Sequence, residues 1–199
     1  STMRPVFENY DRFIIGEEAV NAFLILHAEF DLLAFLRRFT VNPNEEHPEG
    51  SLEADISALL HEYRDKFSDK LEEDEVELPA SDILADSFGL TPEEIRSTIR
   101  SAQTYNSLIG KCWEELVRCI FSRLDGYEQN PDMGDNREPC DIVVRPDAYD
   151  PKYSVQSRDG GTTSGWADDA EWLQEEEDLN PIFLIMRDDP HPDPVRTAE

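Results

Sequence analysis

The segment from Ala148 to Ser157 alternates between polar and apolar side chains, which is the pattern of a β-strand with two unlike faces. Its polar positions are Asp150, Lys152, Ser154 and Gln156. An apolar segment, Cys140–Arg145, precedes it, and the stretch Arg145-Pro146-Asp147 between the two suits a tight turn. The sequence therefore predicts a β-hairpin that carries an acid and a lysine two residues apart on one face.

The segments around this hairpin extend the prediction to a small α+β domain. Residues 110–124 have apolar side chains at helical spacing, and the polar linker after them contains a short strand near Tyr127. After the hairpin, a glycine-rich loop over residues 158–165 leads to an acidic helix over residues 166–178, and the apolar run Ile182–Met186 suits a buried strand. The predicted order is helix, strand, two strands, helix and strand, with a frayed, proline-rich tail.

The first 107 residues are predicted to be mainly helical. Apolar side chains at helical spacing favour one long helix over Glu17–Phe39, and Ser51 is a suitable N-cap for a second helix. We therefore expect an α+β fold with two regions. Residues 1–107 form a helical region, and residues 108–199 form a small mixed sheet with its helices.

The stretch from Ser81 to Ser101 has features of a helix-turn-helix unit. Gly89 suits a helix C-cap, and Thr91 with Pro92 suits the start of the next helix. In that second helix Arg96 and Arg100 are placed to face a DNA groove, although two glutamates open it. A plain helical hairpin has the same signature, so both interpretations stay open.

The chain is strongly acidic, with 18 basic and 45 acidic residues and a net charge of −27. Only four of the basic residues are lysines, a composition similar to that of proteins from salt-loving archaea, whose acidic surfaces stay hydrated at molar salt. At low salt this charge repels nucleic acid. At about 1 M salt the Debye length is roughly 3 Å, so binding to DNA would depend on short-range contacts.

Three charged side chains of the hairpin form a candidate metal site. Asp141 opens the first strand, and Asp150 and Lys152 share a face of the second. Two neighbouring carboxylates repel each other unless a cation lies between them, and Mg²⁺ prefers such oxygen ligands. We expect Asp141 and Asp150 to bind Mg²⁺, and Lys152 to orient or activate a water beside it.

This pattern resembles the PD-(D/E)xK nuclease superfamily, in the stretches Pro139-Cys140-Asp141 and Asp150-Pro151-Lys152 and in the order of helices and strands. The stretch from Asp150 to Thr162 is most similar to type II restriction endonucleases. Two departures are Cys140 between the proline and Asp141, and Pro151 at the variable position. Because proline lacks the N–H of a ladder bond, we expect a bulge or an edge there.

The resemblance also implies an acid on the first core helix, in a pattern matched by Gly110, Glu114 and Val117. Glu114 lies about 90° from the centre of the apolar stripe of that helix, at its edge, whereas Glu115 is nearly opposite and is expected to face solvent. We therefore predict Glu114 as a further catalytic and metal-binding acid. Gln156 and Arg158 are candidate DNA contacts.

The resulting hypothesis is a Mg²⁺-dependent endonuclease of type II restriction type that cuts duplex DNA as a homodimer. No run of about 18 apolar residues is present, so we expect no membrane-spanning segment. Cys112, Cys119 and Cys140 have no metal-ligand spacing and indicate reduced thiols in a cytoplasmic protein. The alternatives are a catalytically silent protein of the same fold, an acidic competitor of DNA, and a helix-turn-helix DNA-binding or regulatory protein.

Overall fold

The computed structural model describes residues 12–69, 84, 87, 102–134, 139–154 and 160–187. The chain forms two compact units, residues 1–20 with 124–199, and residues 21–123. These units do not follow the predicted division after residue 107. Helix α6 (Ala102–Phe121) runs through that position, and strand β1 (Arg12–Ile15) belongs with the C-terminal sheet.

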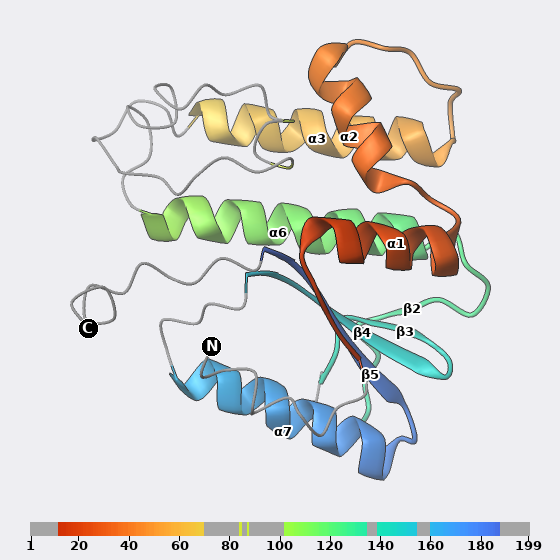
Figure 1. Ribbon diagram of the computed structural model, residues 1–199, viewed down its shortest axis with the longest axis vertical. Coiled ribbons are helices and arrows are strands. Elements are labelled where there is room, and N and C mark those ends of the chain that lie inside the picture. Colours follow the sequence, from red (N-terminus) through yellow and green to blue (C-terminus); the bar gives the residue numbers. More distant parts are fainter. Residues whose placement is uncertain are drawn as a thin grey trace. The chain divides into compact units, whose positions relative to one another are not determined.

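The fold class is α+β, as predicted, with helices dominating the first half and a mixed five-stranded sheet built mostly from the second (Figure 1). The sheet has the strand order β1-β5-β4-β3-β2. Its other members are β2 (Glu128–Gln129), β3 (Ile142–Val144), β4 (Asp147–Ser154) and β5 (Asn180–Arg187). From α6 onward the order of elements is the predicted one, with helix α7 (Gly160–Glu176) between β4 and β5.

Strand β4 lies inside the sheet, antiparallel to β3 and parallel to β5. The hairpin prediction is confirmed: β3 and β4 are joined at Arg145 and Pro146, with Val144 opposite Asp147. Strand β1 was not predicted from the sequence. It pairs parallel to β5, with Phe13 opposite Phe183, and becomes a strand because β5 offers an edge to a short apolar segment.

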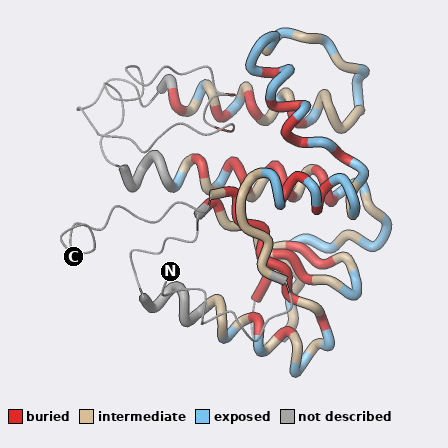
Figure 2. The backbone as a smooth tube through the Cα atoms, in the orientation of Figure 1, coloured by how far each residue is buried: buried red, intermediate tan, exposed pale blue. Residues whose placement is uncertain are grey.

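Helix α7 covers one face of this sheet, as Figure 1 shows within the sheet unit. Two apolar clusters join the helix to the strands. One contains Ala170, Phe183 and Ile185 with the half-buried Phe13, Ile15 and Trp166. The other contains Cys140, Val143, Ala148, Leu173 and Leu179 with Met133 and Trp172. Figure 2 shows that β4 and β5 are largely buried.

The predicted start of the acidic helix at Trp166 is wrong, because α7 begins at Gly160. Glycine lowers intrinsic helix propensity, and three glycines therefore favour a loop when the sequence is considered locally. Packing of the apolar face of α7 on the sheet stabilises the helix as a whole, and tertiary contacts of this kind outweigh propensity.

The single helix predicted over Glu17–Phe39 is two helices, α1 (Glu17–Ala28) and α2 (Leu32–Val41). Glu29 has a positive φ of 52°, which ends α1, and Asp31 caps α2 by accepting a hydrogen bond from the Ala34 N–H at 3.1 Å. Buried Asn21 donates to the Asp31 carboxylate at 2.9 Å and accepts from the Leu33 N–H. The apolar spacing continues across the break, which is why it was not visible in the sequence.

Helices α3 (Leu52–Asp69) and α6 pack against each other in the unit of residues 21–123. The predicted cap of α3 is confirmed, since the Ser51 hydroxyl accepts from the Ala54 N–H at 3.1 Å. The core of this unit includes the fully buried side chains of Ile56, Leu60, Tyr63, Phe67, Trp113 and Leu116.

No single helix in the described part of the chain is long and apolar enough to cross a membrane. Helices α1 and α2 meet that criterion only when they are taken together, and they are bent by 113° at the break between them.

Candidate active site

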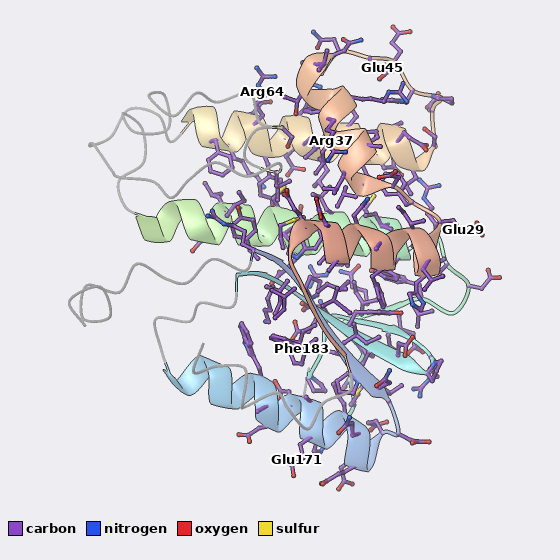
Figure 3. The ribbon with its side chains drawn as sticks, viewed as in Figure 1. Glu29, Arg37, Glu45, Arg64, Glu171 and Phe183 are labelled. Carbon is purple, nitrogen blue, oxygen red and sulfur yellow. The ribbon has the colours of Figure 1, made fainter. Side chains whose placement is uncertain are left out.

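The register of the sheet places Asp150 and Lys152 on the face that α7 covers. Asp150 is opposite Phe183 in the parallel ladder, and Lys152 is opposite Ile185. Residues opposite each other in a ladder share a face, and Phe183 and Ile185 belong to the cluster under α7. Figure 3 labels Phe183 on the sheet and the exposed Glu171 on the outer side of α7. An acid and a lysine therefore lie on an otherwise apolar, covered face.

Asp141, the residue just before β3, lies close to Asp150 on the same face. Its N–H donates to the Tyr149 carbonyl at 3.2 Å, and its own carbonyl accepts from the Asn130 N–H at 2.7 Å. The ladder pairs Ile142, not Asp141, with Tyr149, so the bond to Tyr149 departs from the regular register. Backbone bonds on both sides thus hold Asp141 just before β3 begins, beside the part of β4 that runs past β3.

The three predicted side chains come together on this face. Lys152 Nζ lies 3.3 Å from Asp150 Oδ1, and the two side chains are only 25% and 15% exposed. The carboxyl groups of Asp150 and Asp141 are also hydrogen-bonded to each other. A hydrogen bond between two carboxyl groups requires a proton on one of them.

The environment raises the pKa of Asp150 from its ordinary value of 3.8 to about 7. Burial is the main cause, because it penalises the charged form. The Lys152 ammonium group opposes this rise, whereas the negative charge of Asp141, and the hydrogen bond that protonated Asp150 donates to the Asp141 carboxylate, add to it. Burial and the neighbouring Asp141 carboxyl group therefore favour the protonated form of Asp150. A bound cation would instead neutralise the charge of the two carboxylates.

Aromatic rings line the site on the side of α7. Lys152 Nζ lies 5.1 Å from the centre of the Trp166 ring, within the range of a cation–π interaction. Trp166 stacks on Phe183 with ring centres 6.1 Å apart, and Phe183 also contacts Phe13 at 5.8 Å. Neither Trp166 nor Phe183 is recognisable as a site residue from the sequence. A tryptophan near an apolar helix face is most often a core residue, and local spacing does not link it to Lys152.

Pro151 does not interrupt the sheet, although β4 is not an edge strand. The Tyr149 carbonyl faces β3, so the backbone nitrogen of Pro151, two residues later, faces the same side. The pairing of β3 covers only Asp147 to Tyr149. The N–H that proline lacks would therefore point past the end of β3, and Pro151 keeps its place opposite Leu184 of β5. At Pro151, β4 therefore has an unpaired edge on the side of β3, as expected, but it remains paired with β5 on the other side.

Glu114 is half-buried on α6, in the unit of residues 21–123, whereas Asp141, Asp150 and Lys152 are in the sheet unit. Its role as a further acid stays a prediction. Glu115 does not simply face solvent, as the helical geometry suggested. It is half-buried and close enough to raise the pKa values of Tyr63 and Cys112, after the larger effect of burial on each. The reason is that α3 packs on that side of α6.

Four predicted DNA contacts, Gln156, Arg158, Arg96 and Arg100, lie outside the described residues, as does nearly all of the helix-turn-helix candidate. No cluster of three or more histidine, cysteine or acidic side chains suited to a metal ion occurs within the described ranges. The donor set of Asp141 and Asp150 nevertheless fits Mg²⁺, which is commonly held by one or two carboxylates together with water and phosphate oxygens.

The arrangement thus combines a carboxyl pair, an ammonium group and an aromatic wall on one face of a central strand. Comparison of the chain with protein-family models, curated proteins and solved structures gave no match.

Proposed function

We propose that this protein is a Mg²⁺-dependent endonuclease of type II restriction type, which hydrolyses phosphodiester bonds in duplex DNA. The observation that carries the proposal is the convergence of Asp141, Asp150 and Lys152, with a pKa of about 7 for Asp150. A strongly perturbed carboxyl group next to a specific charged partner is a feature of functional sites. The resemblance of this segment to the PD-(D/E)xK superfamily supports the same assignment.

In the proposed reaction Asp141 and Asp150 would hold Mg²⁺, and Glu114 is proposed from the sequence as a further catalytic and metal-binding acid. When bound, the ion neutralises charge on the reacting phosphate and lowers the pKa of a water. Lys152 provides a positive charge 3.3 Å from Asp150, so its ammonium group can orient the attacking water or a phosphate oxygen. Asp150 must release its proton before it binds a metal, because the ligand is the carboxylate.

The substrate contacts are proposed from the sequence. Gln156 and Arg158 come a few residues after β4 in the sequence and are proposed as DNA contacts, and Arg96 and Arg100 would contact a groove or phosphates. A homodimer would supply two sites, one for each strand of the duplex. Because the chain carries a net charge of −27, we expect DNA binding to require raised salt or divalent ions. A cytoplasmic location is part of the same proposal.

The test is plasmid cleavage with Mg²⁺ over a series of KCl concentrations. We expect discrete fragments that disappear in EDTA and in the variants Asp150→Asn and Lys152→Ala. The matched control is Lys66→Ala, because Lys66 also lies beside a carboxylate, Glu62 at 3.0 Å, and an aromatic ring, Tyr63 at 4.5 Å. This control should cut like the wild type.

Other results would assign the protein differently. Retardation of DNA without metal and without cleavage would favour a helix-turn-helix or silent binding protein. Neither cleavage nor retardation at any salt concentration would contradict the nuclease assignment and leave the acidic competitor of DNA. Cleavage that persists in Lys152→Ala and Asp150→Asn would place the activity elsewhere or in a contaminant.

A further inference from the structure

We infer that Trp166 is a positioning residue that holds the ammonium group of Lys152 beside Asp150. The catalytic consequence of this inference rests on the proposed function, but the position of Lys152 does not. The two can therefore be tested separately.

Lys152 is held between two groups of different kinds. Its Nζ lies 3.3 Å from Asp150 Oδ1 and 5.1 Å from the centre of the Trp166 ring. A lysine side chain is a flexible four-carbon stem that ends in a compact charge, so one carboxylate alone permits many orientations of the stem. A ring face at a second position attracts the cation through its quadrupole and restricts those orientations.

The Trp166 ring is itself fixed by the strands that carry the site. It stacks on Phe183 with an angle of 28° between the ring planes. Phe183 lies opposite Asp150 in the β4–β5 ladder. The residue that supports the Trp166 ring is therefore a direct neighbour of the acid in the sheet. Phe13 also contacts Phe183 and extends the aromatic cluster to β1, the strand next to β5. The ring is thus placed relative to Asp150 by the ladder register.

Lys66 offers a reference inside the same chain. It also lies beside a carboxylate and over an aromatic ring, but Glu62, Tyr63 and Lys66 all belong to one helix. The Lys66 and Glu62 side chains are 40% and 55% exposed, against 25% and 15% for Lys152 and Asp150. Solvent screens the Lys66 pair, so we expect its ammonium group to be more mobile than that of Lys152.

The first measurement is NMR relaxation of Lys Cε in protein that carries ¹³C-labelled lysine. The chain has four lysines, and Lys152→Arg identifies the signal of Lys152. We expect an upfield ring-current shift of the Lys152 Hε protons and a Cε order parameter higher than that of Lys66. In Trp166→Leu the order parameter of Lys152 should fall to the value of Lys66, whereas Trp166→Phe should keep most of it.

Trp172→Leu is the matched control, because Trp172 lies on α7 and packs against the second apolar cluster. This variant should lower stability without changing the Lys152 order parameter. An unchanged order parameter in Trp166→Leu, or an equal fall in Trp172→Leu, would overturn the inference. Thermal unfolding shows whether each variant is folded. If Trp166→Leu does not fold, Trp166→Phe still tests the inference.

The second measurement separates binding from turnover in plasmid cleavage. In Trp166→Leu we expect kcat to fall about tenfold with little change in KM, since the ring acts on the orientation of Lys152 and not on DNA. Trp166→Phe should recover most of kcat. Equal losses of kcat in Trp166→Leu and Trp172→Leu would count against the inference. If the wild type does not cut DNA, the proposed function is wrong, and the relaxation data still decide whether Trp166 fixes Lys152.

Discussion

Asp150 of β4 lies opposite Phe183 of β5 in the parallel ladder, so an ionisable carboxyl group shares a sheet face with an aromatic cluster. The carboxyl group is 15% exposed and is hydrogen-bonded to a second one, that of Asp141. This relationship accounts for the raised pKa of Asp150, and several expected outcomes depend on it.

The stability of the metal-free protein should depend on the protonation of Asp150. Its pKa rises from 3.8 to about 7 on folding, so the folded state binds more protons between these values. The free energy of unfolding should therefore be higher near pH 4 and fall as the pH rises through about 7, by up to about 4 kcal/mol from this group. Asp150→Asn should lose this part of the dependence.

Urea unfolding in EDTA at a series of pH values measures the effect. The difference between wild type and Asp150→Asn removes the general repulsion of the acidic chain from the comparison. A difference that does not vary between pH 5 and pH 8 would show that the Asp150 pKa is not raised.

Replacing Lys152 with methionine should destabilise the protein more at pH 8 than at pH 5. At pH 8 the Asp150 carboxylate would lose the cation that lowers its pKa, at a cost of about 1–3 kcal/mol for a mostly buried charge. At pH 5 Asp150 is protonated and the loss should shrink. Lys66→Met, in the exposed pair with Glu62, should cost less than about 1 kcal/mol at either pH. Equal losses for the two variants in chemical denaturation would contradict this prediction.

Mg²⁺ should stabilise the protein in the absence of DNA. A single site occupied at a hundredfold excess over its Kd adds about 2.7 kcal/mol to the free energy of unfolding. Asp141→Asn and Asp150→Asn should remove the stabilisation, and Glu62→Gln on the exposed face of α3 should not. Because Asp150 must lose its proton, calorimetry in buffers of different ionisation enthalpy should detect proton release that is larger at pH 6 than at pH 8.

The three thiols should differ in reactivity. Burial, and to a smaller extent the carboxylates of Asp150, Asp141 and Asp169, raise the pKa of Cys140 to about 12. Burial also raises the pKa of Cys112, which is fully buried. The half-buried Cys119 has a raised pKa as well, but it is the most accessible of the three. We therefore expect iodoacetamide at pH 8 to modify Cys119 first, as measured by mass spectrometry of the native protein.

The parts of the fold that were predictable from the sequence are those with a local signature. Alternation along Ala148–Ser157 and the turn at Pro146 indicated the hairpin, and the helical spacing of residues 110–124 indicated most of α6. The errors lie where local patterns compete with distant contacts. The break between α1 and α2 depends on Asn21, whose side chain bonds Asp31 and Leu33 across the turn. Strand β1 depends on a partner about 170 residues away in the chain.

The order of Asp150, Pro151 and Lys152 in the sequence already implies that the acid and the lysine share a face, because alternate residues of a strand point the same way. The meeting of Asp141 with Asp150, and of Trp166 with Lys152, depends on how β3, β5 and α7 pack around β4. Burial by that packing is also what raises the pKa of Asp150, since desolvation depends on neighbours that are distant in the sequence. The chain order supplies the chemical groups, and the packing of the sheet under α7 brings them together.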